Sequence, residues 1–221
     1  MQVIYPQRGR MTSGQQRAWE RSWQRWGAEV AELPEGPLDT DEWFGRAAPV
    51  VLEIGSGMGE STAAMALAAP QLNHLAVEVY QPGLAQLLMR IERAGITNLR
   101  LLRGDAHTLL IRHIAPDSLH GVRIYFPDPW PKRRHHKRRL VRPEFVALVA
   151  SRLAAGGIVH LATDWDSYAE QMLAACTAEP ALRNQAGEGF APRPPWRPIT
   201  KFEQRARAEG RAVRDLLFTR I

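Results

Sequence analysis

The sequence predicts an α/β fold in which helices cover both faces of a mostly parallel sheet. Short apolar runs typical of buried strands alternate along the chain with helical patterns of about 10–15 residues. The chain has 221 residues, of which 45% are apolar and 24% charged, as is usual for one ordinary globular domain. Because ligands bind such sheets at the carboxyl ends of the strands, residues that follow a strand are the first functional candidates.

The segment before this alternation is expected to form a basic arm and a helix over 1–45, followed by the main domain over 46–221. Residues 1–13 have little hydrophobic periodicity, which is typical of a flexible arm. Residues 34–45 contain two prolines and a glycine near their start, and this composition predicts a linker.

Three tryptophans indicate a helix between the arm and the linker. Trp19, Trp23 and Trp26 are spaced i, i+4 and i+7, so they lie on one stripe of a helix predicted within 14–33. We expect this stripe to dock the helix on the core.

The alternation begins near residue 49 and continues to the end of the sequence. Strands are predicted at 49–55, 74–80, 98–106, 121–129, 157–164 and 212–221. Helices are predicted at 60–70, 82–95, 143–157 and 165–176. Pro82 near the start and Gly95 at the end bound the second of these helices, and a glycine C-cap is expected to end the third. Residues 187–200 are a proline-rich connection.

The formal net charge of +6 is distributed unevenly. Residues 1–26 carry +4, residues 132–142 carry +7 and residues 193–221 carry +5, so the rest of the chain carries −10. Basic segments on a mildly acidic body indicate a polyanionic partner, most often a nucleic acid. The alternative is that these segments are only solvated faces of the protein.

Composition excludes several classes of site and setting. Cys176 is the only cysteine, so neither an intrachain disulfide nor a cysteine-based zinc site is possible, and we expect it to fill the core. His135 and His136 would point about 100° apart on a helix, so no metal site is expected there. The sequence shows no secretory signal and no membrane span, which predicts a cytoplasmic protein without a membrane partner. It leaves monomer and homodimer open.

A glycine-rich turn after the first strand predicts a nucleoside-cofactor site. In the segment EIGSGMGE (53–60), Gly55, Gly57 and Gly59 let the backbone approach a ligand closely. A dinucleotide fingerprint needs a small residue at position 60, where Glu60 would repel a pyrophosphate. This disfavours a dinucleotide oxidoreductase and favours S-adenosylmethionine, which has no phosphate.

The next two strands also end in acidic residues. Glu78, 23 residues after Gly55, is placed to accept hydrogen bonds from ribose hydroxyls. Asp105 is placed to accept from an adenine amino group, and it can also cap a helix. Together with the glycine turn, these carboxylates strengthen the prediction of a nucleoside cofactor.

The fourth strand runs into a stiff, proline-rich loop and then a basic run. Asp128 lies on the expected substrate side of the strand end, and Trp130 either stacks on a base or is buried. The following run, KRRHHKRR (132–139), can neutralise several phosphates. Asp164, after the fifth strand, places a second carboxylate at the same edge or caps a helix.

These motifs make the sequence resemble the bacterial tRNA (guanine-N7-)-methyltransferases over nearly its whole length. The resemblance rests on RGRMTSGQ (8–15), LEIGSGMGE (52–60), FPDPWPKRRHHKRR (126–139), ATDW (162–165) and RPITKFEQRARAEG (197–210). It implies a Rossmann-like class I fold with a seven-stranded sheet, S-adenosylmethionine as cofactor, and methylation of a guanine in the tRNA variable loop.

The resemblance also implies roles for individual residues. Asp128 is the implied active-site residue, and the implied cofactor contacts are Glu53, Glu78, Asp105 and Asp128. Substrate contacts are implied at Lys132, Asp164, Thr200, Lys201, Phe202 and Glu203. The implied RNA-interacting stretch consists of Arg134, His135, His136, Lys137, Arg138 and Arg139. Pro131 stands where other members often carry histidine, which puts a role for a histidine there in doubt.

Two further functions compete with this reading. A methyltransferase acting on an exocyclic amino group would carry an aromatic residue after two prolines, whereas here Trp130 takes the place of the second proline. A non-enzymatic RNA-binding protein could keep a relic of the fold, but the intact acidic series at the strand ends disfavours it. The position of the methyl group on the product distinguishes the amino-methyltransferase from an enzyme that acts on guanine N7. Titration with S-adenosylmethionine distinguishes the non-enzymatic RNA-binding protein from an enzyme.

Overall fold

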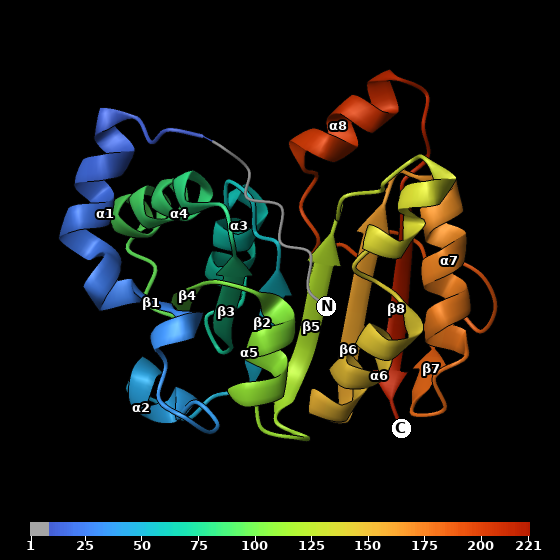
Figure 1. The fold of residues 1–221 in the computed structure, drawn as a ribbon, viewed down its shortest axis with the longest axis horizontal. Helices are drawn as coiled ribbons and strands as arrows, with labels where there is room; N and C mark the ends of the chain where they lie inside the picture. The colour runs from blue at the N-terminus through green and yellow to red at the C-terminus, as the bar shows by residue number, and fades with distance from the viewer. Residues whose placement is uncertain (1–8) are drawn as a thin grey trace. The chain divides into compact units, whose positions relative to one another are not determined.

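The computed structural model describes residues 9–221, drawn in Figure 1, where the grey trace marks residues 1–8. The arm predicted over 1–13 therefore lies mostly outside the described residues. The chain forms two compact units, divided after Ala115. Both units are mixtures of strands and helices, as the predicted α/β fold requires.

The strands of the first unit are all parallel and lie in the order β1-β4-β3-β2. They are β1 (Gly27–Glu29), β2 (Val50–Ile54), β3 (Asn73–Glu78) and β4 (Leu99–Arg103). Ile54 pairs with Val77, and Glu78 pairs with Arg103. The carboxyl ends of β2, β3 and β4 therefore share one edge, where the sequence places its acidic residues.

The first unit has five α-helices and a short 3₁₀ helix among the described residues. They are α1 (Ser13–Trp26), η1 (Val30–Glu32), α2 (Thr40–Phe44), α3 (Glu60–Ala68), α4 (Gln81–Ala94) and α5 (Ala106–Arg112). Thr12 and Gln15 form a capping box that begins α1. Pro82 lies in the first turn of α4, and Gly95 ends that helix at φ 64°, as predicted.

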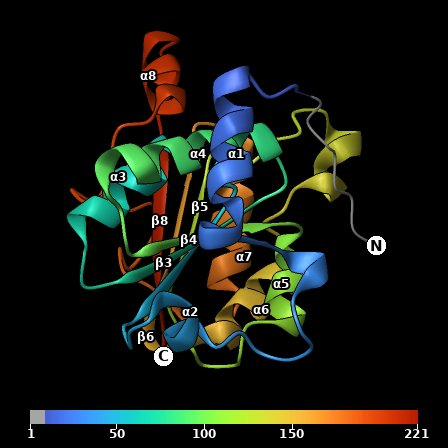
Figure 2. The same ribbon diagram turned by 90° about the vertical axis from the view of Figure 1, so that its left-hand side faces the viewer.

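The tryptophan stripe docks α1 on the core, as expected. Trp19, Trp23 and Trp26 are partly buried against a cluster that includes Leu84 and Leu88 of α4. Figures 1 and 2 show α1 next to α4, which runs across it. The helix of the predicted N-terminal segment thus packs within the first unit.

The helix predicted within 14–33 ends at Trp26. The chain becomes extended at Gly27, where a Cβ would lie 2.3 Å from the ring of Trp23. Residues 27–29 then form β1, which pairs with β4. This pairing adds a strand that hydrophobic periodicity did not indicate, because only three residues take part.

The second unit contains one parallel and two antiparallel strand pairs in the order β5-β6-β8-β7. The strands are β5 (Leu119–Tyr125), β6 (Leu153–Thr163), β7 (Leu182–Asn184) and β8 (Arg214–Arg220). The helices are η2 (Arg133–Arg138), α6 (Pro143–Arg152), α7 (Asp166–Thr177) and α8 (Lys201–Ala208). Cys176 is fully buried, as expected, and burial raises the pKa of its thiol to about 12.

The helix predicted over 143–157 ends earlier, at Arg152. Its last carbonyls accept hydrogen bonds from the backbone N–H groups of Asp117 and Ser118. Gly156 and Gly157 lie inside β6, beside a shift in its pairing with β5, and do not cap the helix. A Cβ at Gly157 would lie 2.8 Å from the carbonyl oxygen of Ala154, so the irregularity in the strand requires glycine at this position.

Eight strands occur in residues 9–221, whereas the resemblance implied seven, and most pairings are parallel as predicted. The short elements α2, α5, α8 and β7 were not predicted, because segments of three to eight residues carry little periodicity. Within residues 9–221, no helix is both long enough and apolar enough to cross a membrane.

Candidate active site

The glycine turn after β2 is fastened to the strand end of β3. The backbone N–H of Gly55 donates to the carbonyl of Val77 at 2.9 Å. The backbone N–H of Gly57 donates to Oε2 of Glu78, also at 2.9 Å. The turn is therefore held at the carboxyl edge of the first unit's strands, where a ligand of this fold is expected.

The three glycines of the turn have different structural roles. Gly55 and Gly57 have φ values of 81° and 55°, and a Cβ at either would meet no atom within 4 Å. A Cβ at Gly59 would instead lie 2.6 Å from the side chain of Leu87. Gly55 and Gly57 thus leave open space beside the backbone, whereas Gly59 allows α3 to pack closely on α4.

Glu78 is half-buried and uses both carboxylate oxygens. Oε1 accepts from the backbone N–H groups of Val79 and Tyr80 at 2.7 and 2.9 Å. Within residues 9–221, Oε2 accepts one hydrogen bond, from Gly57, which leaves that oxygen able to accept another. The predicted hydroxyl contact is therefore compatible with the carboxylate as it is held here.

Two more predicted carboxylates belong to the same edge of the first unit. Glu53 is buried within β2, two residues before the glycine turn. Asp105 follows β4 and caps α5 by accepting a 2.7 Å hydrogen bond from the backbone N–H of Thr108. That bond uses Oδ1 of Asp105, so the helix cap expected from the sequence is confirmed, and Oδ2 accepts no hydrogen bond within residues 9–221.

The loop after β5 has a strained backbone at two positions. Phe126 and Trp130 have φ values of 50° and 45°, which non-glycine residues rarely adopt. They flank the segment Pro127-Asp128-Pro129, in which the Asp128 side chain is exposed. Such strain persists only where surrounding contacts hold the loop, and it is concentrated at functional sites.

Arg139, which the resemblance placed in the RNA-interacting stretch, provides one of those contacts. It is only 2% exposed, and its guanidinium donates to the carbonyl of Pro129 at 2.8 Å and to Gln171 Oε1 at 2.8 Å. It also donates to the hydroxyl of Ser167 at 3.0 Å. Arg139 therefore ties the loop to α7, because its donors are used within the protein and not offered to RNA phosphates.

The rest of the basic run forms η2 and the residues beside it. Lys132, Arg134 and Lys137 are exposed, whereas His135, His136 and Arg138 are partly covered. The Arg138 guanidinium lies 5.0 Å from the ring centre of Trp130, and His135 contacts the same ring edge-on. Trp130 is thus half-buried under this run. Burial and the surrounding cations lower the pKa of His135.

Asp164 follows the end of β6, and Asp128 follows the end of the neighbouring strand β5. Tyr125 pairs with Ala162 in parallel strands, so the two carboxylates follow neighbouring strand ends within the second unit. Arg211 donates to Oδ2 of Asp164 from Nε at 3.0 Å and from Nη2 at 2.8 Å. Oδ1 accepts no hydrogen bond within residues 9–221. The structure therefore brings two predicted carboxylates together and orients one of them.

A buried ionic network lies under the β5 loop and was not predicted. Arg197 is fully buried and donates to both carboxylate oxygens of Asp215, at 2.7 and 2.8 Å. His160 Nε2 lies 2.8 Å from Asp215, and His160 Nδ1 lies 2.8 Å from the Tyr125 hydroxyl. Since a carboxylate only accepts, Nε2 carries the proton, and neutral His160 accepts from Tyr125 through Nδ1.

Burial and pairing set the charge states in this network. Burial lowers the pKa of His160 more than its hydrogen bond to Asp215 raises it, so the ring is neutral near pH 7. Burial acts to raise the pKa of Asp215, but hydrogen bonds from His160 and Arg197 outweigh it and lower that pKa. Arg197 and Asp215 are therefore a charged pair inside the protein.

Glu203, for which the resemblance implied a substrate contact, belongs to this network. Its carboxylate is 1% exposed and accepts from Arg197 Nη1 at 2.6 Å and from Arg207. Thr200 caps α8 by accepting from the backbone N–H of Glu203 at 3.1 Å. Glu203 thus holds the start of α8, because its charge is satisfied by arginines and its side chain does not reach solvent.

The neighbouring residues of α8 remain exposed. Phe202 is 65% exposed, and its ring stacks on Phe126 at 5.8 Å between ring centres. Lys201 is exposed beside it. The buried network therefore places an aromatic ring and a cation next to the loop that carries Asp128.

Part of this arrangement could have been found in the sequence. Asp215 interrupts the apolar strand over 212–221, and a charge at such a position signals a buried partner. No comparable pattern marks Arg197 or Arg211, which lie in polar segments.

The fold, the glycine turn and the acidic strand ends define a Rossmann-like methyltransferase of class I. The fold is similar to that of the aminoglycoside resistance methyltransferase NpmB1, with a TM-score of 0.57 and 15% identity over 85% of this chain and 98% of that one. It is also similar to a 30S ribosomal A1408 methyltransferase from an uncultured bacterium, with a TM-score of 0.55 and 13% identity over 86% of this chain and all of that one.

Sequence relatives identify the family. The family described as "Putative methyltransferase" matches residues 47–216. The chain is 53% identical to the tRNA (guanine-N(7)-)-methyltransferase of Streptomyces coelicolor over 98% of this chain and 79% of that protein. It is 54% identical to the enzyme of the same name from Bordetella pertussis over 96% of this chain and 82% of that protein. The chain belongs to the tRNA (guanine-N(7)-)-methyltransferase family, which confirms the resemblance found in its motifs.

Proposed function

We propose that this chain transfers a methyl group from S-adenosylmethionine to N7 of a guanine in the variable loop of tRNA, in the cytoplasm. Family membership supports the methyl transfer to tRNA guanine. The observation that carries the assignment of residues is the juxtaposition of Asp128 and Asp164 at neighbouring strand ends, beside exposed Phe202 and the basic run.

The residues of the first unit fit this cofactor. S-adenosylmethionine supplies an activated methyl group on a sulfonium, and it has a ribose, an adenine and no phosphate. A side chain at Gly55 or Gly57 would fill the open space beside the turn, and the buried hydroxyl of Ser56 has no hydrogen-bond partner in residues 9–221. Glu78 has a free acceptor position for ribose hydroxyls, and Asp105 has one for the adenine amino group.

Carboxylates suit a reaction whose product is a cation. N7 of guanine carries a lone pair and no proton, so no residue has to act as a general base on it. Asp128 and Asp164 hold the base through its amino and ring N–H groups and stabilise the positive charge that develops on the ring. Arg211 fixes Asp164 through Oδ2, which leaves Oδ1 for the base. Positioning of the guanine relative to the methyl donor supplies the rest of the rate enhancement.

Exposed cations and one aromatic ring suit the RNA around the target base. Phe202 offers a stacking surface next to the Asp128 loop. Lys132 and Lys201 are exposed and contact phosphates. Thr200 and Glu203 act as positioning residues, because they form the start of α8.

Methyl transfer from labelled S-adenosylmethionine to an unmodified tRNA transcript tests the function. We expect label in the RNA, and chemical mapping should place it on N7 of one guanine in the variable loop. Label on an exocyclic amino group would identify the alternative amino-methyltransferase. Binding of RNA without any transfer would identify a non-enzymatic RNA-binding protein.

The exposed cations of the basic run should govern RNA affinity. Replacing Arg134 and Lys137 together by alanine removes two charges that make no hydrogen bond or ion pair within residues 9–221. We expect the Kd for tRNA to rise about ten-fold and the plot of log K against log salt to become shallower by about 1.5. Arg183→Ala, at an exposed position of β7, is the matched control. An unchanged salt slope in the double variant would contradict this role.

A further inference from the structure

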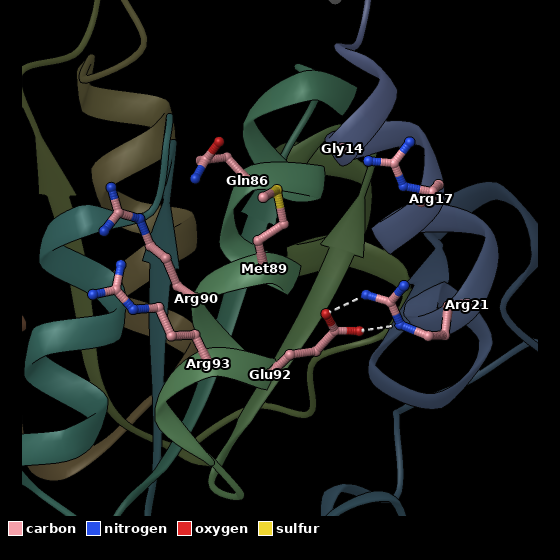
Figure 3. Close-up of a pocket in the computed structure, with 8 residues that line it drawn as sticks. All are labelled: Gly14, Arg17, Arg21, Gln86, Met89, Arg90, Glu92 and Arg93. Carbon is pink, nitrogen blue, oxygen red and sulfur yellow. Dashed lines mark hydrogen bonds and ion pairs between the residues drawn. The ribbon is translucent and has the colours of Figure 1, made fainter.

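A groove between α1 and α4 in the first unit carries a concentration of arginines that the reaction does not use. Its volume is about 630 Å³, and Figure 3 shows its lining residues. Arg17 and Arg21 extend from α1, Arg90 and Arg93 extend from α4, and Met89 lies between the helices. Four arginines lie here against one carboxylate, so the α1–α4 groove, defined by these residues, is strongly basic.

Packing within the first unit holds this groove in shape. Glu92, in the last turn of α4, accepts hydrogen bonds from Arg21 and from Ser22 of α1. The Arg21 guanidinium holds the pKa of Glu92 below its usual range. Gln15 donates to the carbonyl of Pro82 at 3.3 Å and joins the starts of the two helices. The groove is therefore a fixed surface, and its only carboxylate is already paired with an arginine.

The remaining charges are not balanced by the protein. Arg17 is exposed on α1, Arg93 is exposed on α4, and neither makes a hydrogen bond or ion pair within residues 9–221. Arginines that face one groove without acidic partners repel one another, and an anionic ligand relieves this repulsion. Arginine suits phosphate in particular, because its planar fork donates two parallel hydrogen bonds.

The shape of this surface favours a strand of RNA over a compact anion. Arg17 and Arg21 are four residues apart, or about 6 Å along the axis of α1. Arg90 and Arg93 are about 4.5 Å apart along α4. Arg17 of α1 and the two arginines of α4 therefore lie on opposite sides of the apolar Met89, while Arg21 is paired with Glu92. A phosphodiester backbone presents charges at regular intervals and fits such an arrangement.

The groove also adjoins the glycine turn after β2. Arg90 Nε donates to the carbonyl of Met58 at 3.3 Å. A Cβ at Gly83, in the first turn of α4, would lie 2.2 Å from the carbonyl oxygen of Gly57, so this helix packs directly on the turn. RNA in the groove would therefore lie next to the part of the first unit that holds the methyl donor.

We propose that the α1–α4 groove binds the phosphodiester backbone of the tRNA substrate and forms a contact separate from the basic run over 132–139. This inference rests on the proposed function, because it assumes that tRNA is the substrate. The proposal places the basic residues of α1 on a defined surface. Two arginines of α4, which the charge pattern of the sequence did not single out, belong to the same surface.

The test is the double variant Arg17→Ala/Arg93→Ala of the full chain, compared with Arg112→Ala on the exposed end of α5. Binding of an unmodified tRNA transcript is measured at several salt concentrations, and methyl transfer is measured as a function of tRNA concentration. We expect the Kd and the KM for tRNA to rise about ten-fold, the salt slope to become shallower by about 1.5, and kcat to stay unchanged. Calorimetric binding of S-adenosylmethionine and the Tm should match those of the parent and the control.

The outcomes separate this proposal from the proposed function. If the double variant keeps the affinity and the salt slope of the parent while the parent methylates tRNA, the groove does not bind RNA and the function stands. If the variant instead changes self-association in sedimentation and leaves RNA binding intact, the groove is a protein interface and the proposal is overturned. If the parent transfers no methyl group to tRNA, the proposed function itself fails.

Discussion

Asp128→Ala is expected to lower kcat on tRNA by about 100-fold or more, on the order of 3 kcal/mol of transition-state stabilisation. The carboxylate lies in a loop whose backbone is held in an unusual conformation by Arg139 and by pairing with β6, so its charge is placed before the substrate binds. Because the guanine ring becomes cationic on methylation, loss of this charge weakens the transition state more than the bound ground state. Single-turnover methyl transfer to saturating tRNA measures the effect.

Two further variants make this expectation specific. Asp128→Asn keeps the shape of the side chain and removes its charge, so a loss similar to that of the alanine variant would assign the effect to charge. Asp166→Ala removes an exposed carboxylate three residues beyond the end of β6 and should leave kcat within two-fold of the parent. Near-normal turnover of both Asp128 variants would show that this carboxylate does not act on the reacting base.

Arg197→Met is expected to destabilise the fold by about 3–5 kcal/mol, because it leaves Asp215 and Glu203 buried without their shared cation. Both carboxylates are 1% exposed, so water cannot replace the lost hydrogen bonds without local opening. The free energy of unfolding from denaturant titration, together with the Tm, measures the loss.

Arg193→Met is the control for the Arg197 variant. Arg193 lies 3.9 Å from the same Glu203, but its side chain is 35% exposed. Its removal should lower the unfolding free energy by no more than about 1 kcal/mol. Equal effects of the two variants would mean that Arg197 contributes no more than an exposed ion pair, contrary to its burial.

The glycine turn illustrates what local patterns predict well. Three glycines after a short apolar run specified the turn and its place at the end of a strand, and the structure has it there. The patterns could not show that Gly59 serves helix packing, because its neighbour is Leu87 on the next helix. The role of each glycine depends on which element approaches it.

Charged residues illustrate what local patterns predict poorly. Arg139 and Glu203 belong to motifs that the resemblance linked to RNA and substrate, yet both are buried and paired with protein groups. Arg17 and Arg93 belong to no such motif, yet they line one groove. Residue type and spacing do not reveal which charges face solvent.

The order of the longer strands and helices, the glycine turn and the acidic strand ends follow from the sequence, because hydrophobic periodicity and turn residues act over a few neighbouring positions. Only the tertiary structure decides which partner each charged side chain has. Pairing of β6 with β8 places Asp215 beside His160, 55 residues away, and Arg197 reaches the same carboxylate from 18 residues away. Burial and ion pairing depend on such distant neighbours, and these neighbours decide which charged side chains are paired inside the fold and which stay exposed.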